Sequence, residues 1–266
     1  AKIEIVHDEV TADIAPRREK RVRKHLIYER LAAEFIGTLF LVLTVGLSVA
    51  GGSPMAPVAI GLVLAVQIYT FGAVSGGFFN PAVTLAVLLS GRNKITPLRA
   101  ALYVLFQFMG AIIGGFWAYV ATDRTFCFDY VLTRPGGWGT SFEMEMLFTM
   151  ALCSTVLAAG TSNDAPNQYF GLAIGMTVTG GAAAAGGFDQ GSFNPAVTVG
   201  INFANFANDS STHNPGVGAW FLFLLVPFLG AVLAAGVFRG TRGSEFEKRY
   251  EEVPDVKEND EPLNSI

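Results

Sequence analysis

Long runs of apolar residues, separated by short polar or glycine-rich connections, dominate the pattern along the chain. A helix needs about 20 mainly apolar residues to cross the hydrocarbon core of a bilayer. Six windows of the sequence meet this requirement, at roughly 31–50, 56–75, 98–121, 143–160, 169–186 and 217–238. The pattern therefore predicts six membrane-spanning helices.

Two further apolar segments are too short to cross a bilayer. PAVTLAVLLSG follows the second predicted span, and PAVTVGINFANF follows the fifth. About a dozen helical residues rise only half of the bilayer thickness. Glycines at 76–77, 186–187 and 191 allow the chain before each segment to fold back tightly. Each segment is predicted to be a re-entrant half-helix that dips toward the middle of the membrane.

A repeated phrase gives the chain an internal symmetry. FFNPAVT occupies residues 78–84 and SFNPAVT residues 192–198, which places Asn194 and Asn80 194 − 80 = 114 residues apart. Glu34 and Glu145 each stand near the start of an apolar span, 145 − 34 = 111 residues apart. Each copy contains three spans, so the second copy enters the membrane inverted relative to the first. The sequence therefore predicts an inverted repeat, which many transport proteins contain.

Composition and charge support a multi-pass membrane protein. Apolar residues make up 51% of the 266 residues and charged residues only 15%. With both termini in the cytoplasm, only Arg124 and Arg134 of the 18 basic residues fall outside, as the positive-inside rule favours. The plasma membrane and a vacuolar or other internal membrane both remain open. The predicted organisation is a cytoplasmic segment (1–27), a membrane domain (28–240) and an acidic cytoplasmic tail (241–266).

The Asn-Pro pairs have an ordinary reading and a functional one. Proline suits the first position of a helix, and asparagine is among the best residues before it, so either pair alone is a common helix start. At the tips of two opposed half-helices, however, the amides of Asn80 and Asn194 offer N–H donors to one water molecule. That water cannot relay a proton, and the two helix dipoles disfavour cations. The repeated pair therefore predicts a conductor of neutral solutes.

These motifs identify a resemblance to the aquaporin, or major intrinsic protein, superfamily. It is carried over about residues 28–240 by AEFIGT, SGGFFNPAVT, the second NPA, LAIG at 172–175 and VPFLGAVLA at 226–234. The resemblance implies an all-α membrane protein with six transmembrane helices plus two re-entrant half-helices, a homotetramer with one pore per subunit, and passive permeation. The residues that match the two pore motifs are Asn80, Pro81, Ala82, Asn194, Pro195 and Ala196.

The two glutamates match positions that brace the re-entrant loops in this family. The resemblance implies that Glu34 and Glu145 accept hydrogen bonds from backbone N–H groups of those loops. A carboxyl group buried in a span is costly unless it is paired. A role as proton carriers is the weaker alternative, because no histidine or lysine lies within the predicted spans to continue a relay.

The outer filter departs from the family pattern. Most members have arginine directly after the second NPA, but here that position is Val197. The resemblance carries the other filter positions onto Ile60, Ala182 and Gly191. We therefore expect a wide, apolar ring that passes water and small neutral solutes such as glycerol, urea and ammonia. Phe78 replaces a common histidine and is expected to pack.

Other functions compete with this one. A water-selective channel with a narrower pore and a structural junction protein on the same fold remain alternatives, and a coupled carrier would need additional carboxyl groups at the midplane. The sequence contains no evident nucleophile, metal cluster or phosphate-binding loop, so no enzyme, metal site, cofactor or nucleic-acid partner is predicted. Cys127 and Cys153 are expected to be unpaired thiols, and the Asn208 glycosylation sequon a chance match.

Overall fold

The computed structural model describes residues 25–132, 137–163, 168–186 and 190–246. Most of the predicted N-terminal segment and of the acidic tail lie outside the described residues. Within them the protein is all helical, with eight α-helices and no strand. The helices are α1 (Ile27–Ala50), α2 (Ala56–Ser75), α3 (Pro81–Leu89), α4 (Pro97–Thr122), α5 (Gly137–Thr155), α6 (Phe170–Ala185), α7 (Pro195–Phe206) and α8 (Val217–Thr241).

The six predicted spans are confirmed as helices. Five are long and apolar enough to cross a membrane, with α5 continued by the π-helical turn Val156–Gly160. α6 is apolar but has only 16 residues, about 24 Å of helix. α5 begins at Gly137 rather than at the predicted 143, because GWGTSF forms helix although it does not read as a continuous apolar run.

The long helices pack in pairs that repeat between the two halves. α1 packs along α4 in the first half and α5 along α8 in the second, while α2 packs on α6 across the halves. Glycines allow this close approach, as is usual between membrane helices. A Cβ at Gly114 of α4 would overlap the Leu39 carbonyl oxygen of α1, and one at Gly230 of α8 would overlap the Met146 carbonyl oxygen of α5.

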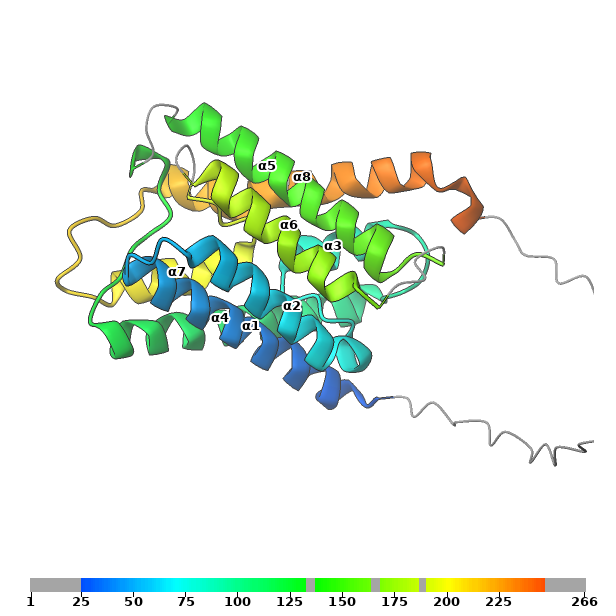
Figure 1. The fold of residues 1–266 in the computed structure, drawn as a ribbon, viewed down its shortest axis with the longest axis horizontal. Coiled ribbons are helices and arrows are strands. Elements are labelled where there is room, and N and C mark those ends of the chain that lie inside the picture. The colour runs from blue at the N-terminus through cyan, green and yellow to red at the C-terminus, as the bar shows by residue number, and fades with distance from the viewer. Residues whose placement is uncertain (1–24, 133–136, 164–167, 187–189, 247–266) are drawn as a thin grey trace, which may run out of the picture.

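The two half-helices, α3 and α7, lie within the bundle and point toward its opposite ends (Figure 1). The described ends of the chain both lie at one end of the bundle, which we call the inner end (Figure 1). The outer end carries the connections 123–132 and 207–216. The charge pattern of the sequence predicts that the inner end faces the cytoplasm.

A buried ion pair ties the C-terminal end of α8 to the inner end of the bundle. Arg92, after α3, lies 3.1 Å from Glu245 and also donates to the Thr161 carbonyl oxygen at 2.9 Å. Its guanidinium stacks 4.2 Å above the Phe238 ring. Burial alone would raise the pKa of Glu245, but hydrogen bonds from the Asn163 N–H and from Arg92 lower that pKa below its ordinary value. The pair therefore favours an ionised carboxylate here.

Candidate functional site

A cavity of about 280 Å³ lies between the long helices and reaches the tips of both half-helices. Its walls come from α1, α2, α5 and α6, from the loops that precede α3 and α7, and from Phe126 and Phe128 of the outer connection. None of the described lining residues carries a charge. The polar side chains that line it are Asn80, Gln190, Ser192 and Asn194.

The two asparagines begin the half-helices and join them. The Oδ1 atoms of Asn80 and Asn194 accept hydrogen bonds from the N–H groups of Ala82 and Ala196, at 2.8 and 2.9 Å, which caps α3 and α7. Pro81 and Pro195 hold the first helical positions, where no N–H is needed.

Each asparagine also donates across the midplane to the other loop. Asn80 Nδ2 donates to the Phe193 carbonyl oxygen and Asn194 Nδ2 to the Phe79 carbonyl oxygen, both at 2.9 Å. The sequence predicted that both amides donate to a water molecule, and it did not predict that one hydrogen of each joins the two loops. The second Nδ2 hydrogen of each has no protein partner among the described residues, and both side chains line the cavity.

The residue before each asparagine has an unusual backbone conformation. Phe79 and Phe193 have φ values of 51° and 50°, in the left-handed region that residues other than glycine rarely occupy. Both side chains are buried, at 0% and 2% exposed. This conformation turns each loop so that its backbone carbonyl faces the opposite asparagine and its N–H faces into the protein, and it persists only where the surroundings hold it.

Glu34 supplies those surroundings for the first loop. Its carboxyl group is fully buried and accepts the N–H groups of Phe78 at 3.1 Å and Phe79 at 2.8 Å. The Ser75 hydroxyl and the Gln107 amide also donate to it, at 2.5 and 2.8 Å. The sequence alone did not reveal Ser75 and Gln107 as donors, although a glutamine inside the apolar run 98–121 was a usable signal.

Glu145 occupies the matching place in the second half. It is fully buried and accepts the N–H groups of Ser192 at 2.7 Å and Phe193 at 2.8 Å. The structure thus places both glutamates against the loops that the resemblance assigned to them. These bonds pair a carboxyl group that would be costly to bury alone.

The four predicted filter residues all line the same cavity. Ile60 comes from α2, Ala182 from α6, Gly191 from the loop before α7, and Val197 from the first turn of α7. Gly191 has φ +67°, which suits glycine. That the four form the narrowest ring of the pore stays a prediction.

Phe78 combines the packing role predicted for it with a place in the cavity wall. Its ring is 8% exposed and meets the Tyr103 ring edge-on, with 5.8 Å between the centroids. Tyr103 in turn donates its hydroxyl to the Ser75 carbonyl oxygen at 2.8 Å. Phe78 also lines the cavity, near Asn80.

The two cysteines and the asparagine of the sequon are buried in the protein. Cys127 and Cys153 are free and buried. Burial, and then the charge of Asp129, raise the pKa of the Cys127 thiol to about 11. Asn208, of the sequon, is 8% exposed and donates its amide to the Thr125 hydroxyl at 2.9 Å.

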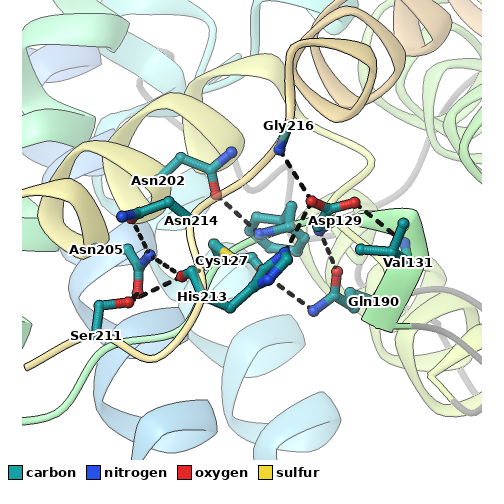
Figure 2. Close-up of polar contacts among 11 residues, drawn as sticks. Cys127, Asp129, Val131, Gln190, Asn202, Asn205, Ser211, His213, Asn214 and Gly216 are labelled. Atoms are coloured by element: carbon teal, nitrogen blue, oxygen red, sulfur yellow. Dashed lines mark hydrogen bonds and ion pairs between the residues drawn. The ribbon is translucent and has the colours of Figure 1, made fainter.

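A polar network at the outer end, shown in Figure 2, could not be predicted from the sequence. Asp129 Oδ2 accepts the Gly216 N–H and contacts His213 Nε2, both at 3.0 Å. Asn205 Nδ2 donates to the His213 carbonyl oxygen at 2.8 Å. Asn202 Oδ1 accepts a hydrogen bond from the Phe128 N–H at 2.8 Å. We call these residues, with Cys127 and Gln190, the outer network. It joins the connections 123–132 and 207–216 to α7.

The chain resembles known proteins in sequence and in fold. The chain is 36% identical over 222 residues to a glycerol uptake facilitator protein-like 6 of Lactiplantibacillus plantarum, covering 80% of this chain and 97% of that protein. It is 29% identical to a probable aquaporin NIP-type of Nicotiana alata, covering 83% and 80%. The aquaglyceroporin of Plasmodium falciparum has a similar fold, with a TM-score of 0.65 at 19% identity, covering 80% of this chain and 96% of that one.

The family comparison covers most of the chain. The sequence profile described as Major intrinsic protein matches residues 21–238, which include both half-helices, both bracing glutamates and every predicted filter position. The chain is therefore an integral membrane protein that belongs to the major intrinsic protein family of channels.

Proposed function

We propose that the protein is a passive channel for water and small neutral solutes, such as glycerol, urea and ammonia, with a wide, arginine-free outer filter. The observation that carries the proposal is the uncharged cavity that reaches both pore asparagines and is lined by Ile60, Ala182, Gly191 and Val197. Selectivity in such pores depends on diameter and on the hydrogen-bonding groups of the wall. An apolar filter without charge favours permeation by several small neutral solutes over strict selection for water.

The midplane supplies the polar contacts. The second N–H of Asn80 and of Asn194 donates to the oxygen of a passing solute, while the N-termini of α3 and α7 direct positive potential at the same place. A water held there keeps its hydrogens for its neighbours, so no continuous proton relay forms. Glu34 and Glu145 already accept two backbone N–H groups each, which supports a bracing role over ion coupling.

One observation favours the alternative of a narrower, water-selective pore. Phe126 and Phe128 of the outer connection both line the cavity, and their rings meet edge-on, with 5.4 Å between the centroids. The small side chains of the predicted filter would leave a wide opening, and aromatic side chains at the outer mouth reduce its width. A structural junction protein on the same fold would show no solute flux at all.

Stopped-flow light scattering on proteoliposomes separates these functions. Vesicles with the purified protein are compared with lipid-only vesicles for shrinkage in sorbitol and re-swelling in glycerol and in urea. Fast shrinkage with fast re-swelling supports the broad channel. Fast shrinkage alone supports the water-selective alternative, and rates equal to those of lipid alone contradict both.

The assembly and orientation implied by the resemblance belong to the same proposal. We expect a homotetramer with one pore per subunit and both termini in the cytoplasm. The exposed apolar side chains on the long helices, such as Leu62, Val66 and Trp117, would then contact lipid or a neighbouring subunit. The mass of the purified protein in detergent, measured by light scattering after gel filtration, tests the tetramer.

A further inference from the structure

We propose that Gln190 is a further specificity-determining residue, which supplies the polar group at the outer end of the pore that Val197 lacks. The inference rests on the proposed channel function. Gln190 directly precedes the filter residue Gly191 and lines the same cavity. Neither the pore motifs nor the four filter positions include it.

Two hydrogen bonds hold the Gln190 amide at both of its ends. Its Oε1 atom accepts the Asp129 N–H at 2.6 Å, and its Nε2 atom donates to the Cys127 carbonyl oxygen at 2.8 Å (Figure 2). An amide nitrogen has two hydrogens. The second Nε2 hydrogen has no protein partner in the part of the chain that the structure describes, and it is available to a solute.

The backbone that holds this amide is itself fixed. The Asp129 side chain is 3% exposed and accepts the N–H groups of Val131 at 3.1 Å and Gly216 at 3.0 Å, besides its 3.0 Å contact with His213. A free glutamine side chain has rotamer freedom, which opposes any fixed position. The two hydrogen bonds to this anchored segment offset that cost, so the amide is ready before a solute arrives.

Few polar side chains line the cavity, so the Gln190 amide is important for how a solute is bound there. Asn80 and Asn194 serve the midplane, and the Ser192 hydroxyl is already engaged, 2.7 Å from the Thr198 hydroxyl and 3.0 Å from the Asn194 carbonyl oxygen. Gln190 is the other polar side chain among the described lining residues. A neutral donor at this place replaces a hydrogen bond that glycerol loses when it gives up its hydration, whereas a water molecule keeps hydrogen bonds to the waters next to it in the pore. The donor adds no charge that would attract an anion.

The competing explanation is that Gln190 only ties the outer connection to the loop before α7. A tie alone would change stability and leave the choice among solutes as it is. The readout must therefore be a ratio of permeabilities, since a ratio does not depend on how much protein folds and inserts. Gln190→Met keeps most of the side-chain volume and removes the amide oxygen and nitrogen. Gln190→Ala removes most of the volume as well as the amide.

The experiment measures water, glycerol and erythritol permeability of wild-type, Gln190→Met and Gln190→Ala proteoliposomes. We expect Gln190→Met to lower the glycerol-to-water ratio about fivefold, the loss of about one hydrogen bond, and Gln190→Ala to raise permeability to the larger polyol erythritol. Ratios within twofold of wild type in both variants would overturn the inference. Wild-type water permeability no greater than that of lipid alone would instead overturn the proposed function, and this inference with it.

A second measurement covers variants that fail to fold. Gln190→Cys in a Cys127→Ser background is treated from outside with a membrane-impermeant methanethiosulfonate reagent. If residue 190 faces the conducting path, modification lowers water flux and reduction with dithiothreitol restores it. Labelling without a change in flux would contradict the inference. Cys127→Ser alone is the matched control, and Cys153 remains buried in both proteins.

Discussion

The two re-entrant loops of this protein share one backbone solution and differ in what surrounds it. In both, an asparagine caps a half-helix and donates to the other loop, a phenylalanine has φ near +50°, and a buried glutamate accepts two N–H groups. This common part fixes the place where the half-helices meet. The repeated FNPAVT of the sequence supplies the phenylalanine and the asparagine of this common part, and the glutamate comes from a separate helix in each half.

The anchoring of the loops is different. The first loop is held from within the bundle by Gln107 and Tyr103 of α4. The second is joined through Gln190 to the outer connection, and from there to the Asp129–His213 contact. The comparison suggests that the geometry common to both loops forms the midplane of the pore. The contacts that differ between the loops then anchor them differently toward the inner and the outer end.

The largest effect is expected where the two loops are alike. Glu34→Gln or Glu145→Gln replaces one acceptor oxygen by an NH₂ group that faces a backbone N–H. An unsatisfied buried donor costs about 1–3 kcal/mol at the loop that shapes the midplane, so each variant should lose most of its water permeability. Thermal unfolding in detergent and vesicle shrinkage measure both effects.

Glu143→Gln is the matched control, because Glu143 lies on α5 but is exposed. It should behave as wild type. If one of the two bracing variants conducts water normally, the two halves do not depend on their glutamates in the same way.

The next effect concerns the outer mouth alone. Val197→Arg adds a charged, bulky group to the apolar ring, and we expect it to lower glycerol permeability about tenfold while water still passes, because width limits the larger solute. Re-swelling rates in glycerol, relative to shrinkage in sorbitol, measure this.

Two controls separate charge from volume and outer mouth from inner. Val197→Leu adds volume without charge, and Val83→Leu makes the same change after the first NPA, where Val83 also lines the cavity. Unchanged glycerol flux in Val197→Arg would count against the wide filter.

A smaller effect distinguishes the two glutamines. Gln107→Leu removes a donor to Glu34 and should lower the free energy of unfolding by about 1–3 kcal/mol. The glycerol-to-water ratio should stay as in wild type, because Gln107 does not line the cavity in the part of the chain that is described. A change in the ratio would show that the inner anchoring also affects selection.

The smallest effect is a reporter of the outer network. Because burial and Asp129 raise the pKa of Cys127 to about 11, its thiolate is scarce at neutral pH and grows as the pH rises toward that value. At pH 8, maleimide labelling should be roughly a hundredfold slower than for an ordinary exposed thiol. His213→Ala loosens the contact with Asp129 and should speed labelling. Equal rates in the two proteins would show that the network does not shield Cys127.

The sequence predicted the helices well; of their contacts it predicted those of Glu34 and Glu145, through the resemblance, and few others. Spans and half-helices depend on the length of an apolar run and on Asn-Pro at a helix start, which are local properties. The start of α5 was placed too late because glycine and polar residues interrupt its first turns. Gln107 was missed because a single polar residue in a span does not reveal its partner.

The sequence by itself therefore determined six spans, two half-helices and their inverted repeat, because each is written in consecutive residues. Only the tertiary structure decided that Asn80 and Asn194 donate across the midplane, that Gln107 supports Glu34, and that Gln190 is held at the pore by the outer connection. These contacts join residues 61 to 115 positions apart. Their geometry depends on how loops from opposite halves pack together, and this packing cannot be predicted from the periodicity of the sequence.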